Sequence, residues 1–133
     1  MTLEMLSSDL KVKYSKETYT LAAGESQSIF YYPSQGVMEM VMVNSNNKDV
    51  RICVTTDGHY SSYTFAEAFA LGLVFPASQV AYLTQYDTDN DVYCAVWAPV
   101  PVWEFKRQFE VSIKNEGSST ASVTVQLLLW TKE

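Results

Sequence analysis

Residues 109–130, FEVSIKNEGSSTASVTVQLLLW, predict the fold class of this 133-residue chain. Apolar and polar side chains alternate from Phe109 to Ile113 and again from Ala121 to Leu129, with a polar turn between the two runs. Such alternation is typical of a strand that is buried on one face and solvated on the other. We therefore predict two antiparallel strands joined as a hairpin.

The same period of two extends over most of the chain. Segments 37–43 and 50–55 flank the polar stretch 44–49, and we predict that they form a second hairpin. Further strand patterns cover residues 10–14, 18–21, 28–32, 79–85 and 92–97. Seven or eight short strands with turn signals between them predict an antiparallel β-sandwich.

One segment departs from this pattern. Thr64-Phe65-Ala66-Glu67 matches a capping box, and Gly72 stands where a helix C-terminal cap falls. We expect one short helix over 65–71, in a crossover between strands. A helix in that place favours a jelly-roll order, so the predicted fold is an all-β, jelly-roll-like sandwich with a single domain over 1–133.

Composition limits the classes of partner. Fifteen acidic residues against nine basic ones give a net charge of −6, without the basic stripe that nucleic-acid binding needs. No apolar run approaches the length of a membrane span. The first nine residues, MTLEMLSSD, lack the basic and apolar regions of a secretory signal. We expect a protein that is made and kept in a cytoplasm, or released by a route that needs no signal.

An acidic loop is the candidate metal site. Asp87, Asp89 and Asp91 have the alternate spacing of a calcium-binding loop. The EF-hand pattern also requires a glycine and a glutamate where this chain has Val92 and Ala98, so that motif is absent. Two interpretations stay open: a solvated acidic turn, or a surface calcium site completed by backbone carbonyls. No other cofactor is expected.

Catalytic motifs are missing from the sequence. His59 lies two residues from Asp57, an arrangement that can orient a general base, but no nucleophile elbow or glycine-rich phosphate loop accompanies it. Cys53 and Cys94 are either free buried thiols or a bridge between two packed sheets. We expect that the protein is not an enzyme.

Aromatic residues are abundant near the predicted strand ends. They either roof the core or form a contact surface, since tyrosine and tryptophan are enriched at interfaces and stack on sugar rings. The candidate surface residues are Tyr60, Tyr63, Tyr86, Trp97 and Trp103.

A methionine stripe offers a second candidate surface. Met38, Met40 and Met42 follow one face of a single strand. Methionine commonly fills gaps in a core. If Val37, Val41 and Val43 face inward, however, the stripe needs a second cover from the helix or from a neighbouring subunit.

Two segments resemble a known group of proteins. Residues 20–28, TLAAGESQS, are similar to the opening strands of β-sandwich domains in virion and surface-layer proteins, and residues 109–119 with 123–125 to their closing hairpin. The resemblance implies a jelly-roll capsid, turret or decoration subunit that brings no catalytic residues. It also implies a homotrimer or homopentamer that assembles with other virion proteins after synthesis in the host cytoplasm.

Two functional hypotheses follow. The first is a non-enzymatic viral structural protein that self-associates through an aromatic, charge-poor surface. The alternative is a carbohydrate-binding sandwich in which Trp97, Trp103 and nearby tyrosines stack on sugar rings, with calcium held by the loop that starts at Asp87.

Overall fold

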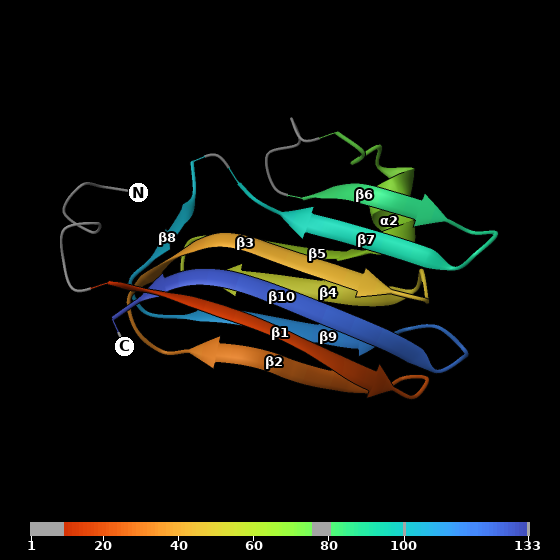
Figure 1. The fold of residues 1–133 in the computed structure, drawn as a ribbon, viewed down its shortest axis with the longest axis horizontal. Coiled ribbons are helices and arrows are strands. Elements are labelled where there is room, and N and C mark those ends of the chain that lie inside the picture. Colours follow the sequence, from red (N-terminus) through yellow and green to blue (C-terminus); the bar gives the residue numbers. More distant parts are fainter. Residues whose placement is uncertain (1–9, 76–80, 100, 133) are drawn as a thin grey trace.

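The computed structural model describes residues 10–75, 81–99 and 101–132, which form ten strands and one short helix (Figure 1). The elements are β1 (Lys11–Leu21), β2 (Ser26–Tyr32), β3 (Gly36–Ser45), β4 (Val50–Thr56), β5 (Tyr60–Thr64), α2 (Phe65–Ala70), β6 (Tyr82–Asp87), β7 (Val92–Trp97), β8 (Trp103–Phe105), β9 (Phe109–Asn115) and β10 (Ala121–Thr131).

The strands form two antiparallel sheets that face each other. The larger sheet has the order β1-β10-β3-β7-β6, with β8 also pairing with β3, and the smaller has the order β2-β9-β4-β5 (Figure 1). The first strand pairs with the last, the second with the ninth, and the fourth with the fifth. The chain is therefore one long antiparallel strip rolled into two sheets, which is a jelly-roll order. The predicted fold class is confirmed.

The number of strands is higher than the seven or eight expected. Short serine side chains hide the alternation in β5, and β8 has only three residues and follows the prolines at 99 and 101. The predicted strand over 79–85 begins at Tyr82 in the structure, and its first two residues lie outside the described part.

Both predicted hairpins are wrong, although all four of their strands are present. β3 and β4 belong to different sheets, and so do β9 and β10. A period of two shows which side chains face the core, but it is the same whether consecutive strands pair or cross the sandwich. The polar segments after β3 and β9 are therefore corners between sheets.

Buried asparagine side chains hold these two corners. Asn115 has no exposed surface; its Nδ2 donates to the carbonyls of Leu21 (3.1 Å) and Ser119 (2.7 Å), and its Oδ1 accepts from the Gly117 amide (2.9 Å). The Nδ2 of Asn47 donates to the same Ser119 carbonyl (3.2 Å). At a corner the backbone N–H and C=O groups have no neighbouring strand to pair with, so side chains such as these must provide their hydrogen bonds.

The predicted helix is confirmed, with its last residue at Ala70. Thr64 Oγ1 accepts from the Glu67 amide (3.0 Å), and the Glu67 carboxylate accepts from the Thr64 amide (3.2 Å), which completes the capping box. Gly72 has a φ of +76° and ends the helix by donating its N–H to the Phe69 carbonyl. At six residues, this helix is too short to cross a membrane, and the described part of the chain contains no other that could.

The core lies between the two sheets. Alternate residues of both sheets fill it, and α2 adds Phe65 and Ala68 where it packs beside β5, β6 and β7. Burial of these side chains is the main term that stabilises such a sandwich. The largest fully buried side chains include Trp97, Tyr93, Phe65, Phe105, Phe109, Leu21 and Met38.

Candidate functional site

The predicted metal loop is an internally hydrogen-bonded turn between β6 and β7. The Asp87 carboxylate accepts from the amides of Asp89 (3.0 Å) and Asn90 (3.1 Å) and from the Asn90 side chain (2.9 Å). The Asn90 hydrogen bonds lower the pKa of Asp87. Asp91 accepts instead from the Tyr93 hydroxyl (3.3 Å). Within residues 10–75, 81–99 and 101–132, no three His, Cys, Asp or Glu side chains are grouped as a metal site requires.

The two tryptophans of the predicted contact surface lie in the core. Trp97 is 1% exposed, and its indole N–H donates to the Ser61 hydroxyl at 2.9 Å. Trp103 is 6% exposed and stacks flat on His59, with 4.6 Å between ring centroids. Both rings are covered, so neither presents an open face at the surface of the protein.

The three tyrosines of that prediction are scattered rather than gathered. Tyr60 is 72% exposed on the edge strand β5, whereas Tyr63 is half-buried against the core. Tyr86 stacks on Phe69 at 4.2 Å and meets Tyr93 edge-on at 5.0 Å. The structure does not bring these side chains together as one platform, and only Tyr60 presents most of its surface to solvent.

The remaining candidate groups are also apart. The Asp57 carboxylate accepts from the backbone amides of Lys106 (3.0 Å) and Arg107 (3.4 Å), so it ties two loops together. Cys53 and Cys94 are free thiols on strands of different sheets. Burial raises the pKa of the Cys94 thiol, which keeps it protonated and unreactive.

An apolar surface that the sequence indicated only in part covers the outside of the larger sheet. Two rows of side chains cross β1, β10 and β3 in register and point away from the core. These rows are Val12–Trp130–Val37 and Tyr14–Leu128–Met40. Val37, which the sequence placed with the inward valines, lies in the outward row because of the bulge that follows it, but it has no exposed surface. Val12 and Tyr14 are 57% and 59% exposed. We define the outer apolar face as Val12, Tyr14, Met40, Leu128 and Trp130; the next row, Lys16–Gln126–Met42, is mostly polar and borders it.

A β-bulge determines which methionines reach this face. The register between β10 and β3 shifts so that Leu128 pairs with Met40 and Leu129 with Met38, which leaves Glu39 as the extra residue. Met38 is therefore in the core, contrary to the predicted stripe, while Met40 points outward. The Glu39 carboxylate accepts from the Trp130 indole N–H at 2.7 Å, so this charge is held at the border of the face.

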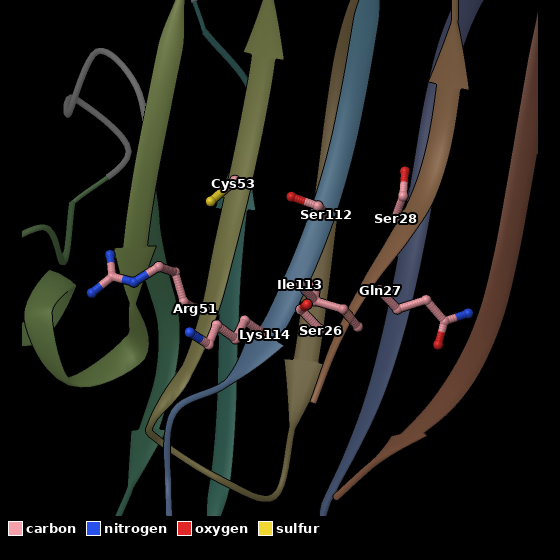
Figure 2. A pocket seen from close by; sticks show the side chains of 8 residues that line it. All are labelled: Ser26, Gln27, Ser28, Arg51, Cys53, Ser112, Ile113 and Lys114. Atoms are coloured by element: carbon pink, nitrogen blue, oxygen red, sulfur yellow. The ribbon is translucent and has the colours of Figure 1, made fainter. Parts of the chain in front are cut away.

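The outside of the smaller sheet is polar and hollowed. A hollow of about 290 Å³ lies over β2, β9 and β4 (Figure 2). Figure 2 shows Cys53, Ser112 and Ser28 side by side across its floor, with Arg51 and Lys114 along one border. The floor is low because its side chains are small.

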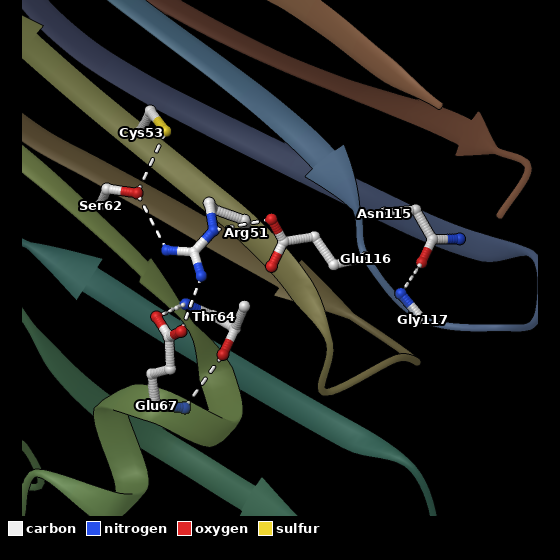
Figure 3. A network of polar contacts seen from close by, with 8 residues as sticks. All are labelled: Arg51, Cys53, Ser62, Thr64, Glu67, Asn115, Glu116 and Gly117. Carbon is white, nitrogen blue, oxygen red and sulfur yellow. Dashed lines mark hydrogen bonds and ion pairs between the residues drawn. The ribbon is translucent and has the colours of Figure 1, made fainter. Parts of the chain in front are cut away.

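Arg51 is the centre of a polar network beside this hollow (Figure 3). Its Nε donates to Glu116 (2.9 Å), one terminal nitrogen to Glu67 (2.6 Å), and the other to the Ser62 hydroxyl (3.0 Å). Hydrogen bonds to Glu116 and Glu67 raise the pKa of the guanidinium. The network therefore connects β4 to α2 and to the corner after β9, which are separated from β4 in the sequence.

Glu67 is expected to make the fold sensitive to acid. The hydrogen bond from Arg51 lowers the pKa of Glu67 below its usual 4.5. A depressed carboxyl pKa contributes stability above the unfolded-state value, and that contribution is lost as the pH falls through the folded value. Glu67→Gln keeps a capping oxygen but removes the charge. We expect the variant to melt below the wild type at neutral pH, with the gap closing between about pH 5 and pH 3.

Thermal melts followed by circular dichroism across this pH range measure the effect. Glu17→Gln, at another exposed glutamate, is the matched control. A gap for Glu67→Gln that stays constant down to the acid end contradicts the predicted ion pair.

No protein-family model matches the chain, and no curated protein sequence matches it. Among solved structures, the capsid asymmetric unit of cyanophage Pam1 is 18% identical, with 91% of this chain and 85% of that chain covered and a TM-score of 0.49. PliG, a periplasmic inhibitor of g-type lysozyme from Salmonella Typhimurium, is 11% identical, with 86% and 90% covered and a TM-score of 0.39. Oxalate oxidase in complex with glycolate is 12% identical, with 86% of this chain but 41% of that chain covered and a TM-score of 0.32. At these scores, none of the three assigns a function to this chain.

Proposed function

We propose that this protein is a non-enzymatic structural subunit of a virus particle, which assembles with copies of itself through the outer apolar face. The observation that carries the proposal is the exposure of Val12 and Tyr14 beside Leu128, Trp130 and Met40, with the nearest charges, Glu39 and Lys16, at the border of this face. Monomeric soluble proteins rarely leave a large contiguous apolar patch in water. Covering this face with a second copy removes it from solvent.

The fold and the charge distribution support this role. Jelly rolls are recurrent in viral capsid domains, although fold alone does not specify function. Most homo-oligomers are closed and symmetric, and we propose a trimer or a pentamer that also contacts other virion proteins. The net charge of −6 favours protein contacts over nucleic acid. In this proposal the subunit is made in the host cytoplasm and is then built into the virion.

Tyr14→Lys tests the proposal directly. The wild type is expected to have three or five times the protomer mass of 15.0 kDa in light scattering after size exclusion. The variant places a charge in the outer apolar face, on the edge strand β1, and burying that charge in an interface costs several kcal/mol. We expect the assembly to dissociate to protomers, or to need at least a tenfold higher concentration.

Thr20→Lys is the matched control, because Thr20 lies on the same strand and on the same side of the sheet, but in a row with Ser122 rather than with apolar residues. The control should keep the wild-type mass. A wild type that is monomeric at high micromolar concentration, or a Tyr14→Lys variant with unchanged mass, would falsify the proposal.

A further inference from the structure

The hollow on the smaller sheet has a floor of small polar side chains. Ser28, Ser112, Cys53 and Ser62 lie opposite one another in register across β2, β9, β4 and β5. Strands are about 4.8 Å apart, so the four side chains form a floor about 14 Å long, enough for more than one sugar ring. All four point away from the core; Ser62 accepts from Arg51, and the members of the row that line the hollow itself are Ser28, Ser112 and Cys53.

The next row on the same face provides taller borders at both edges of the sheet. It runs from Tyr31 on β2, through Glu110 and Thr55, to Tyr60 on β5. Tyr31 is 52% exposed and Tyr60 is 72% exposed. Neither ring lines the hollow itself, but each offers an apolar surface beside the row of small polar side chains, which is the mixture that polar ligands with apolar faces require.

Charge around the hollow indicates which ligands fit it. Two cations, Arg51 and Lys114, stand against three carboxylates, Glu67, Glu116 and Glu110. Arg51 is already paired with two of these carboxylates, so its charge is not available to an anionic ligand. With a local balance of −1 and a net charge of −6 for the whole chain, phosphate, sulfate and uronate groups gain no net attraction from the surrounding charges. A neutral ligand rich in hydroxyl groups is favoured.

We propose that this hollow binds a neutral oligosaccharide. Tyr60 stacks on one sugar ring, and the hydroxyls of Ser112 and Ser28 exchange hydrogen bonds with the sugar hydroxyls. The Glu110 carboxylate already accepts from Ser28 at 2.9 Å and holds that hydroxyl in place. The site lies on the sheet opposite the outer apolar face, so it does not depend on the proposed assembly.

Screening on immobilised neutral gluco-, galacto-, manno- and xylo-oligosaccharides, followed by calorimetric titration of the strongest binder, tests the site. Ser112→Trp fills the hollow and Tyr60→Ala removes the stacking ring, and we expect each variant to weaken binding at least tenfold. Tyr60→Phe keeps the ring and should stay within twofold of the wild type. Thr20→Trp, an equally large change on an exposed strand of the other sheet, should leave affinity unchanged.

Three results overturn this inference: no binding of any neutral oligosaccharide at millimolar concentration, binding that Ser112→Trp leaves unchanged, or binding confined to anionic glycans. Melting curves of the variants show whether each is folded, and Tyr60→Ala changes only an exposed side chain. Measuring the oligomeric mass of each variant separates this test from that of assembly, since either proposal can fail while the other holds.

Discussion

Gly36→Ala is expected to lower the free energy of unfolding by about 3 kcal/mol, because overpacking at a site with no room to relax is strongly destabilising. A Cβ at residue 36 meets the carbonyl oxygen of Trp130 and lies 2.7 Å from a ring carbon of Phe105. Trp130 belongs to the strand β10, which pairs on both sides, and Phe105 has no exposed surface. Neither neighbour has space in which to move.

Urea denaturation followed by tryptophan fluorescence measures this loss. Gly58→Ala is the control, since a Cβ at residue 58 has no atom within 4 Å. That variant should unfold within about 0.5 kcal/mol of the wild type or be slightly more stable, because alanine restricts the unfolded chain. Equal denaturation midpoints for the two variants contradict the predicted close approach at Gly36.

Asn115→Ala should also destabilise the fold by about 3 kcal/mol, since each buried polar group left without a partner costs about 1–3 kcal/mol. The substitution removes the donor to the carbonyls of Leu21 and Ser119 and the acceptor for the Gly117 amide. Leu21 ends β1 and Ser119 lies in the corner before β10. The Asn115 side chain therefore connects the end of β1 to the corner that precedes β10.

Differential scanning calorimetry gives the size of this effect. At roughly 3–4 °C per kcal/mol for a domain of this length, the melting temperature should fall by about 10 °C. Ser118→Ala changes an exposed side chain in the same corner and should melt with the wild type. If both variants melt together, the buried amide does not hold the corner.

Local sequence patterns predicted the individual elements well. Alternation identified most strands, and the Thr64–Glu67 capping box with Gly72 identified the helix, because caps and strand faces depend on residues that are neighbours in the chain. β5 was missed because it contains two consecutive serines, so apolar and polar side chains do not alternate along it.

The candidate surfaces were predicted less completely. Trp97 and Trp103 lie at strand ends, as the sequence suggested, yet their side chains point into the core. The pairing of their strands sets this orientation, and pairing is not visible in the local sequence. The methionine stripe was left open between core filling and a covered outward face: Met40 points outward, whereas the bulge at Glu39 puts Met38 in the core. Tyr60 is the one predicted contact residue that the structure leaves widely exposed.

The sequence by itself determined the all-β class, the capped helix and the alternation within most strands, because these follow from a period of two and from contacts within four residues. The tertiary structure alone decided that β3 and β4, and likewise β9 and β10, cross between sheets. Pairing depends on partners more than a hundred residues away in the chain, and alternation is identical for a hairpin and for a corner. The hollow on one sheet and the apolar face on the other are consequences of that pairing.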